Sequence, residues 1–325
     1  MLAGLIARFP ISMYGLGAVL LVQSRTGSYF KAGLVSASFA IAAAVGGPIT
    51  SRLVDRLGQN RLIPILLSLH VSTLLIMIYL ILNDANLILV IILGIISGAS
   101  QPTIGPFIRA RWKNATRNKV QENTAFAMES VIDEVIFIFG PPLVTFLCVV
   151  FFDASGLLLA AILVTLGGIW LSSQTKTQPE IHVVGAERGK AALRYPGIFS
   201  LFLVYVLLGA VFGAAEVIAV AFSREKGSPE LAGALITAWS VGSLAAGIAM
   251  GTIHFKNKLS RRFLIAAFFF ALSLLPLPFI STMPALFITL LISGLAISPV
   301  LISGYTLIGQ LVPQNRLTEG FAWAN

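Results

Sequence analysis

The chain has 325 residues, of which 57% are hydrophobic and 11% are charged, and its formal net charge is +9. This composition excludes an ordinary soluble domain and favours a protein that crosses a membrane many times. The basic residues are scattered among loops and form no continuous patch, so the positive charge indicates membrane topology and not nucleic-acid binding.

Apolar stretches predict ten membrane-spanning helices of about 20 residues each, and hence an all-α, polytopic helical membrane protein. The predicted spans are 5–22, 32–50, 62–82, 87–107, 125–151, 156–171, 197–221, 231–253, 263–280 and 285–308. Very short connections at 83–86 and 281–284 predict two tight hairpins. The first apolar run carries Arg8 and Pro10 inside it, and no small-residue cleavage site follows, so no cleavable signal peptide is expected.

Lysine and arginine counts predict the orientation of the spans. If the amino terminus is cytoplasmic, the outside loops hold only Arg25, Lys31, Arg224 and Lys226, and the inside segments hold the remaining 18 of the 22 basic residues. Because basic residues concentrate in short cytoplasmic loops, we expect a cytoplasmic amino terminus and a cytoplasmic loop at 108–124.

The connection between the second and third spans carries the most specific motif. In residues 46–63, GGPITSRLVDRLGQNRLI, the residues Asp55, Arg56 and Gly58 follow the spacing L-x-D-R-x-G. Gly58 suits a tight turn, and a carboxylate beside guanidinium groups can hold two helix ends together in one state and release them in another. The motif predicts a conformational latch made by Asp55, Arg56, Gly58 and Arg61.

This motif, in this position, resembles the corresponding loop of major facilitator superfamily transporters. The segments RFPISMYGLG, TGSYFKAGLVSASFA, PFIRARW, SVIDEVIFIFGPPL and EGFAWAN are similar to bacterial, mostly actinobacterial, members described only as transporters or efflux proteins. The resemblance covers most of the chain. It implies a multi-pass protein of the bacterial inner membrane that moves a small-molecule substrate by alternating access, with proton-coupled efflux as one form of that activity. It implies no particular substrate.

An internal repeat at a shift of 200 residues favours two helical bundles, since Phe39 aligns with Trp239 and Gly47 with Gly247. We expect a six-helix amino-terminal bundle, a cytoplasmic linker and an incomplete carboxy-terminal bundle of four helices, at 1–171, 172–196 and 197–325. Two spans are then missing relative to a twelve-helix transporter, which favours a truncated product over a naturally short protein. The alternative function is a non-transporting remnant or a membrane interaction protein.

Two signatures of drug–proton antiporters in this superfamily are incomplete. The fourth span has Gly94 where the pattern R-x-x-Q-G has its arginine. In the fifth span, the pattern G-x-x-x-G-P-x-x-G-G survives only as Gly140 and Pro141. Both departures weaken the assignment to drug–proton antiport without excluding it.

Acidic residues within apolar spans are the candidate proton or substrate sites, because a charge at membrane depth is costly. They are Glu129, Asp133, Glu134 and Glu216. Glu129 and Asp133 share one face of the fifth span, where they form either a protonatable site or a structural clamp to Arg109, Arg111 or another basic group.

The resemblance implies that the first, fourth, seventh and tenth spans line the central cavity. Glu216, in the seventh span, then meets a cationic substrate, carries a proton, or reaches water beside Arg224. The polar or aromatic residues on these spans are either cavity residues or packing residues, and the candidates are Tyr14, Gln101, Tyr205 and Tyr305.

No motif indicates an enzyme, a cofactor or a metal site. The histidines His70, His182 and His254 are far apart, and the single cysteine, Cys148, has no partner for a disulfide. The sequence contains neither H-E-x-x-H nor a Walker-type nucleotide motif. A transporter without a nucleotide site must be driven by an ion gradient or by the gradient of its substrate.

Overall fold

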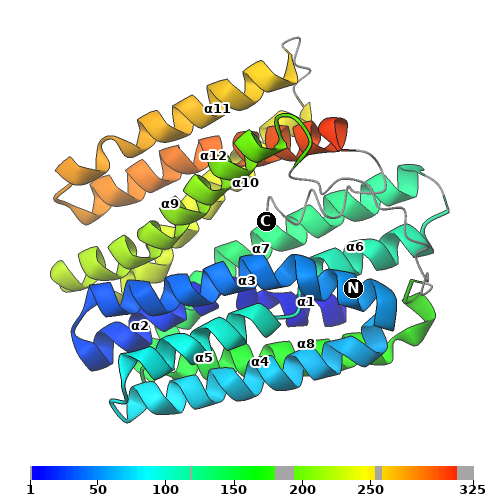
Figure 1. Cartoon of the computed structure of the whole chain (residues 1–325). Coiled ribbons are helices and arrows are strands. Elements are labelled where there is room, and N and C mark those ends of the chain that lie inside the picture. Colours follow the sequence, from blue (N-terminus) through cyan, green and yellow to red (C-terminus); the bar gives the residue numbers. More distant parts are fainter. Residues whose placement is uncertain (1, 118, 180–193, 253–257, 313–325) are drawn as a thin grey trace. The chain divides into compact units, whose positions relative to one another are not determined.

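The computed structural model describes residues 2–117, 119–179, 194–252 and 258–312, in which every regular element is a helix (Figure 1). In chain order these are α1 (Leu2–Arg8), η1 (Phe9–Ser12), α2 (Tyr14–Thr26), α3 (Tyr29–Leu57), α4 (Gln59–Leu82), α5 (Leu87–Ser100), α6 (Ile104–Ala115), α7 (Lys119–Val150), α8 (Ser155–Ser173), η2 (Thr175–Thr177), α9 (Ile198–Glu225), η4 (Pro229–Leu231), α10 (Ala232–Thr252), α11 (Leu259–Leu274), η5 (Leu277–Phe279) and α12 (Met283–Leu311). Within the described residues, ten helical stretches are long and apolar enough to cross a membrane. The prediction of an all-α polytopic fold is therefore confirmed.

The first span is interrupted at a proline. It runs from Leu2 to Thr26, which is longer at both ends than the predicted 5–22, and the 3₁₀ turn η1 separates α1 from α2. Pro10 lies in that turn. Because proline lacks an N–H and its ring clashes with the carbonyl four residues earlier, α1 ends before it, at Arg8.

The fourth span is interrupted in the same way. It runs from Leu87 to Trp112, but α5 ends at Ser100 and α6 begins only at Ile104. Gln101 precedes Pro102 and has φ −59° and ψ 123°, because a residue before proline is disfavoured in the α conformation. The candidate cavity residue Gln101 therefore lies in the break.

Residues suited to turns form the short connections of the first six spans. Gly58 joins α3 directly to α4 with a φ of 87°, a conformation that glycine adopts without steric cost. In the α4–α5 hairpin, Asp84 has a φ of 53°. The Asn86 side chain caps α5 by accepting a hydrogen bond of 2.8 Å from the Ile88 N–H.

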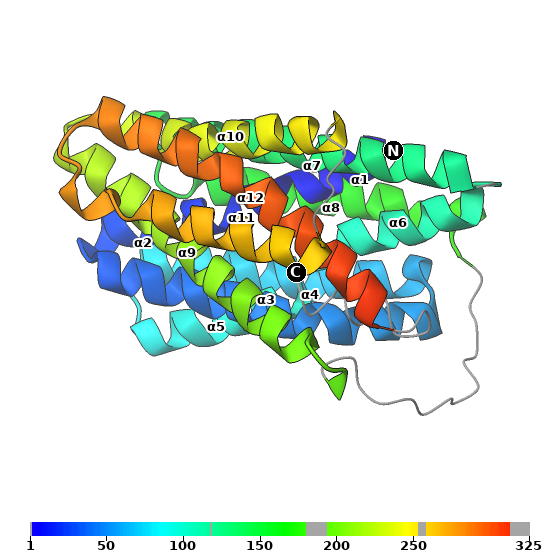
Figure 2. The same cartoon turned by 90° about the horizontal axis from the view of Figure 1, so that it is seen from above.

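The chain folds into two compact units, residues 1–187 and 188–325. The first contains α1 to α8: α8 packs on α1 and α4, while α3 packs on α2 and α5 (Figures 1 and 2). The second contains α9 to α12, and α12 packs on both α10 and α11.

The same close helix crossing occurs once in each unit. A Cβ atom at Gly98 of α5 would collide with the carbonyl of Phe39 in α3, and one at Gly294 of α12 would collide with the carbonyl of Trp239 in α10. Phe39 and Trp239 are the pair that the repeat aligns. Small residues allow such close backbone approach between membrane helices, so glycine is required at both crossings.

Candidate functional site

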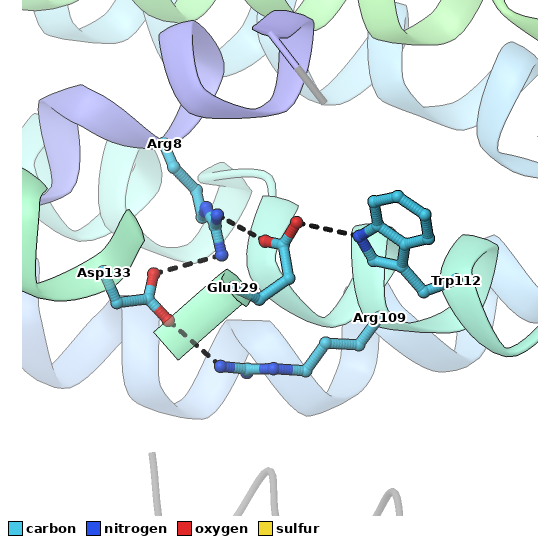
Figure 3. Close-up of polar contacts among 5 residues, drawn as sticks. All are labelled: Arg8, Arg109, Trp112, Glu129 and Asp133. Atoms are coloured by element: carbon cyan, nitrogen blue, oxygen red, sulfur yellow. Dashed lines mark hydrogen bonds and ion pairs between the residues drawn. The ribbon is translucent and has the colours of Figure 1, made fainter. Parts of the chain in front are cut away.

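A partly buried cluster of charged side chains joins the broken first and fourth spans to the fifth (Figure 3). Arg8 ends α1, and its Nη2 donates to Glu129 Oε2 at 2.5 Å, while its Nη1 lies 3.0 Å from Asp133 Oδ1. Both acids lie on α7, one helical turn apart. From α6, Arg109 Nη2 donates to Asp133 Oδ2 at 3.0 Å, and Trp112 Nε1 donates to Glu129 Oε1 at 2.8 Å.

Burial divides the cluster into an inner and an outer pair. The inner side chains, Arg8 and Glu129, are only 4% and 1% exposed, whereas Asp133 and Arg109 are 34% and 44% exposed. Two guanidinium groups balance two carboxylates, which is what buried charges require. Asp133 is the member that touches both arginines and also reaches solvent.

The local sequence explains why these groups meet. Pro10 ends α1, so Arg8 lies in its last turn, where the negative end of a helix favours a cation. Glu129 and Asp133 are four residues apart and therefore project from the same face of α7. The cluster thus connects α1 and α6, the two segments that the breaks separate from α2 and α5, to one continuous helix.

The sequence anticipated part of this arrangement. Arg109 was one of the basic groups expected to clamp Asp133, and the two do form an ion pair. Arg8 was not among the candidate site residues, although a charged residue inside an apolar run is a signal that could have identified it. Whether the cluster also carries protons stays a prediction.

Arg111 makes a different set of contacts from the expected clamp. It is 5% exposed, and its Nε donates to Gln59 Oε1 at 2.6 Å. Its terminal nitrogens donate to the carbonyls of Leu171 and Gln174 at 2.9 and 2.8 Å, and to Thr177 Oγ1 at 2.9 Å. Arg111 therefore joins α6, the start of α4 and the end of α8.

The hydrogen bonds of Arg111 lie next to the predicted latch. Gln59 follows the turn at Gly58, and its Nε2 donates to the Phe107 carbonyl at 3.1 Å, so the start of α4 is fixed to α6. The predicted latch residue Arg61 is exposed. The side chains of Asp55 and Arg56 lie outside the described residues, so their latch role stays a prediction.

Tyr14 lies in the interior of the first unit and contacts a histidine that the sequence did not single out as a site residue. Tyr14 and His70 are 4% and 0% exposed. His70 Nδ1 lies 2.8 Å from the Ser97 carbonyl, and Nε2 lies 2.9 Å from the Tyr14 hydroxyl. Because a carbonyl only accepts, Nδ1 carries the proton and Tyr14 donates to Nε2.

The remaining candidates fall in both units. Glu134 is half-buried on α7, beside the charged cluster. In the second unit, Tyr205 of α9 is 8% exposed and its hydroxyl donates to the Leu301 carbonyl at 3.2 Å. The Tyr205 and Tyr305 rings are 5.6 Å apart, and Glu216 is half-buried on α9. In the described part of the chain, no group of three or more His, Cys, Asp or Glu residues could hold a metal ion.

Comparisons with known proteins identify the family to which this chain belongs. The family model described as Major Facilitator Superfamily matches residues 1–325. No curated protein matches the chain by sequence.

Solved transporter structures share the fold. The chain is similar to a point mutant of the nucleoside transporter NupG, with a TM-score of 0.70 and 16% identity over 99% of this chain and 85% of that one. It is similar to a POT family transporter in complex with a thioalcohol-conjugated peptide (0.69, 13%, 99% and 86%). It is also similar to a bacterial homologue of the iron transporter ferroportin in an inward-facing state (0.67, 14%, 99% and 88%). At these identities the similarity establishes the fold.

Proposed function

The chain belongs to the major facilitator superfamily, and on that premise we propose that it is a secondary transporter that moves a small molecule across a bacterial inner membrane by alternating access. The observation that carries the proposal is the family match over residues 1–325. Two compact units are what rocking of one bundle against another requires. The ferroportin homologue of similar fold has been solved in both inward-facing and outward-facing states.

We further propose that transport is export coupled to protons, with Asp133 or Glu216 as the carboxylate that exchanges them. Asp133 supports this role because it contacts both Arg8 and Arg109 and is 34% exposed. Protonation of Asp133 would remove both of its ion pairs and leave the buried pair of Arg8 and Glu129 intact. Loss of these contacts would release α6 from α7 at Asp133, a discrete change that a proton could drive.

The test uses purified protein in proteoliposomes and a panel of dyes and metabolites. We expect at least one compound to accumulate against its gradient when a pH gradient is imposed, and a proton uncoupler to abolish the accumulation. Accumulation that resists the uncoupler would contradict the proposal of proton coupling and leave the transporter proposal standing. If no compound moves at confirmed protein abundance, the transporter proposal fails and a membrane interaction protein becomes the better description.

The proposed orientation has a direct test. Single cysteines are introduced as Asn86→Cys and Asn114→Cys in a chain that carries Cys148→Ser. Because the basic residues favour a cytoplasmic loop at 108–124, an impermeant thiol reagent on whole cells should label position 86 and spare position 114. Both positions should react after the membrane is permeabilised, and the reverse pattern on whole cells would contradict the orientation.

The proposed latch predicts a transport defect for Asp55→Asn without loss of protein. Removal of one carboxylate weakens a charge-assisted contact in one conformational state only, so we expect transport to fall by about tenfold at unchanged membrane abundance. The matched control is Asp84→Asn, because the Asp84 side chain is 71% exposed and lies 3.7 Å from Arg25. Equal transport by Asp55→Asn and this control would exclude the latch.

A further inference from the structure

A pocket of about 240 Å³ lies at one end of the first unit. The α2–α3 and α4–α5 connections lie at that same end (Figure 1), and residues from both line the pocket. Charged side chains line its polar part: Arg25, Lys31 and Asp84. Buried aliphatic side chains line its apolar part: Val22, Ile81 and Val90. The pocket therefore offers one part to a charged group and another to an apolar chain.

The polar part of the pocket lies at the level where the helices leave the apolar layer of the membrane. Arg25 is the next-to-last residue of the first span, Lys31 lies in the first turn of the second, and Asp84 lies in the turn between the third and the fourth. The adjoining residues Ile88 and Leu89 of α5 are 64% and 51% exposed. Large apolar side chains that are exposed on a membrane span contact lipid chains. Lipid headgroups and the ends of their chains therefore surround this pocket.

The two cations of the pocket are free to bind an anion. Arg25 Nη2 donates to the Leu82 carbonyl at 2.8 Å and lies 3.7 Å from Asp84 Oδ2. These contacts orient the guanidinium group and occupy only one of its three nitrogens. In the part of the chain that the structure describes, the Lys31 amine makes no hydrogen bond and no ion pair. Two cations beside one carboxylate leave the pocket with a net positive charge.

Basic residues are scarce at this end of the spans, which makes their convergence on one pocket informative. The predicted outside loops hold only Arg25, Lys31, Arg224 and Lys226, because basic residues concentrate in cytoplasmic loops. The lysine of the second unit shows the contrast with Lys31. Lys226 Nζ lies 3.2 Å from Glu225 Oε1 and 5.2 Å from the centre of the Phe222 ring. Lys226 thus has partners within the protein, whereas Lys31 has none among the described residues.

We propose that this pocket binds the headgroup of an anionic phospholipid, with Arg25 and Lys31 as the groups that hold its phosphate. A guanidinium group and an amine suit phosphate oxygens, and the apolar part of the pocket suits the start of an acyl chain. A free inorganic anion would leave the apolar part unused. A zwitterionic headgroup would bring a second cation next to Arg25 and Lys31. The site shares no residue with the charged cluster around Asp133 and does not depend on transport.

Native mass spectrometry of the purified full chain in detergent tests the site by measuring the binding of phosphatidylglycerol. The control lipid is phosphatidylcholine with the same acyl chains, and we expect the anionic lipid to bind about tenfold more tightly. Lys31→Gln should remove most of this preference. The matched control is Lys226→Gln, which should keep it, because the Lys226 side chain is 32% exposed and paired with Glu225.

A second measurement uses the parent chain and so needs no variant to fold. An amine-reactive ester modifies exposed lysines, and peptide mass spectrometry quantifies the modification at each one. Phosphatidylglycerol should protect Lys31 and leave Lys226 reactive, while inorganic phosphate at the same concentration should protect neither. Equal binding of the two lipids, an unchanged preference in Lys31→Gln, or an unprotected Lys31 would each overturn the site. Equal protection by inorganic phosphate would show a site for free anions and would overturn the assignment to a lipid.

Discussion

Arg8→Ala is expected to remove most of the folded protein from the membrane. The Glu129 side chain is 1% exposed, and without Arg8 its one remaining partner in the part of the chain that the structure describes is the Trp112 N–H. Removal of one member of a buried ion pair costs about 3 to 5 kcal/mol. That loss is a large fraction of the roughly 5 to 15 kcal/mol by which folded proteins are stable. We therefore expect a much lower unfolding temperature and low membrane abundance.

Cys148 supplies a natural probe for this measurement. It is the only cysteine of the chain and is 6% exposed, so a maleimide fluorophore reacts with it as the protein unfolds in detergent. The matched control is Arg109→Ala, which removes the same charge from a side chain that is 44% exposed. A half-exposed pair contributes at most about 1 kcal/mol. Equal unfolding temperatures for the two variants would contradict the assignment of a buried clamp.

The double variant Arg8→Met with Glu129→Gln separates loss of a contact from loss of charge balance. Methionine and glutamine retain much of the side-chain volume and leave no unpaired charge at the inner pair. Replacement of a buried ion pair by neutral residues is often close to neutral in stability. We expect this variant to unfold at a higher temperature than Arg8→Ala. A double variant less stable than Arg8→Ala would show that packing, and not the unpaired carboxylate, explains the loss.

The spans were predictable because apolar length is a local property of the sequence. Their interruptions were predictable in principle from Pro10 and Pro102, whose effects reach only the preceding turn. The sequence predicted 5–22 and 87–107, while the helices run to Thr26 and Trp112. The first span therefore continues as helix past its apolar stretch through Arg25, and the fourth span does so through Arg109. A count of apolar residues ends each predicted span before these charged residues.

The charged cluster was predictable only in part, because it depends on which helices meet. Spacing along α7 placed Glu129 and Asp133 on one face, and Arg109 was close enough in sequence to be a candidate partner. Arg8 lies 121 residues before Glu129, and no local pattern links the two. The same reason explains His70, which meets Tyr14 across 56 residues. Pairings of this kind follow from tertiary packing alone.

Asp133→Asn is expected to uncouple transport from the proton gradient and to leave the transporter otherwise working. Asparagine keeps the size of the side chain, and its oxygen can still accept a hydrogen bond from Arg8 or Arg109. It cannot bind or release a proton. We therefore expect uphill accumulation to fall by about tenfold or more, while downhill exchange in the same vesicles stays close to that of the parent.

The comparison with Glu129→Gln and Glu216→Gln makes the result specific to one carboxylate. Glu129→Gln leaves the guanidinium of Arg8 short of one charge in a buried site, so it should lose protein abundance and both activities together. Glu216→Gln tests the alternative carrier: if Glu216 carries the proton, this variant, and not Asp133→Asn, loses uphill accumulation and keeps downhill exchange. Only a residue that carries the proton separates the two assays, because coupling requires a group that alternates between two protonation states. Full uphill transport by Asp133→Asn would remove Asp133 from the coupling step and leave it a structural clamp for Arg8 and Arg109.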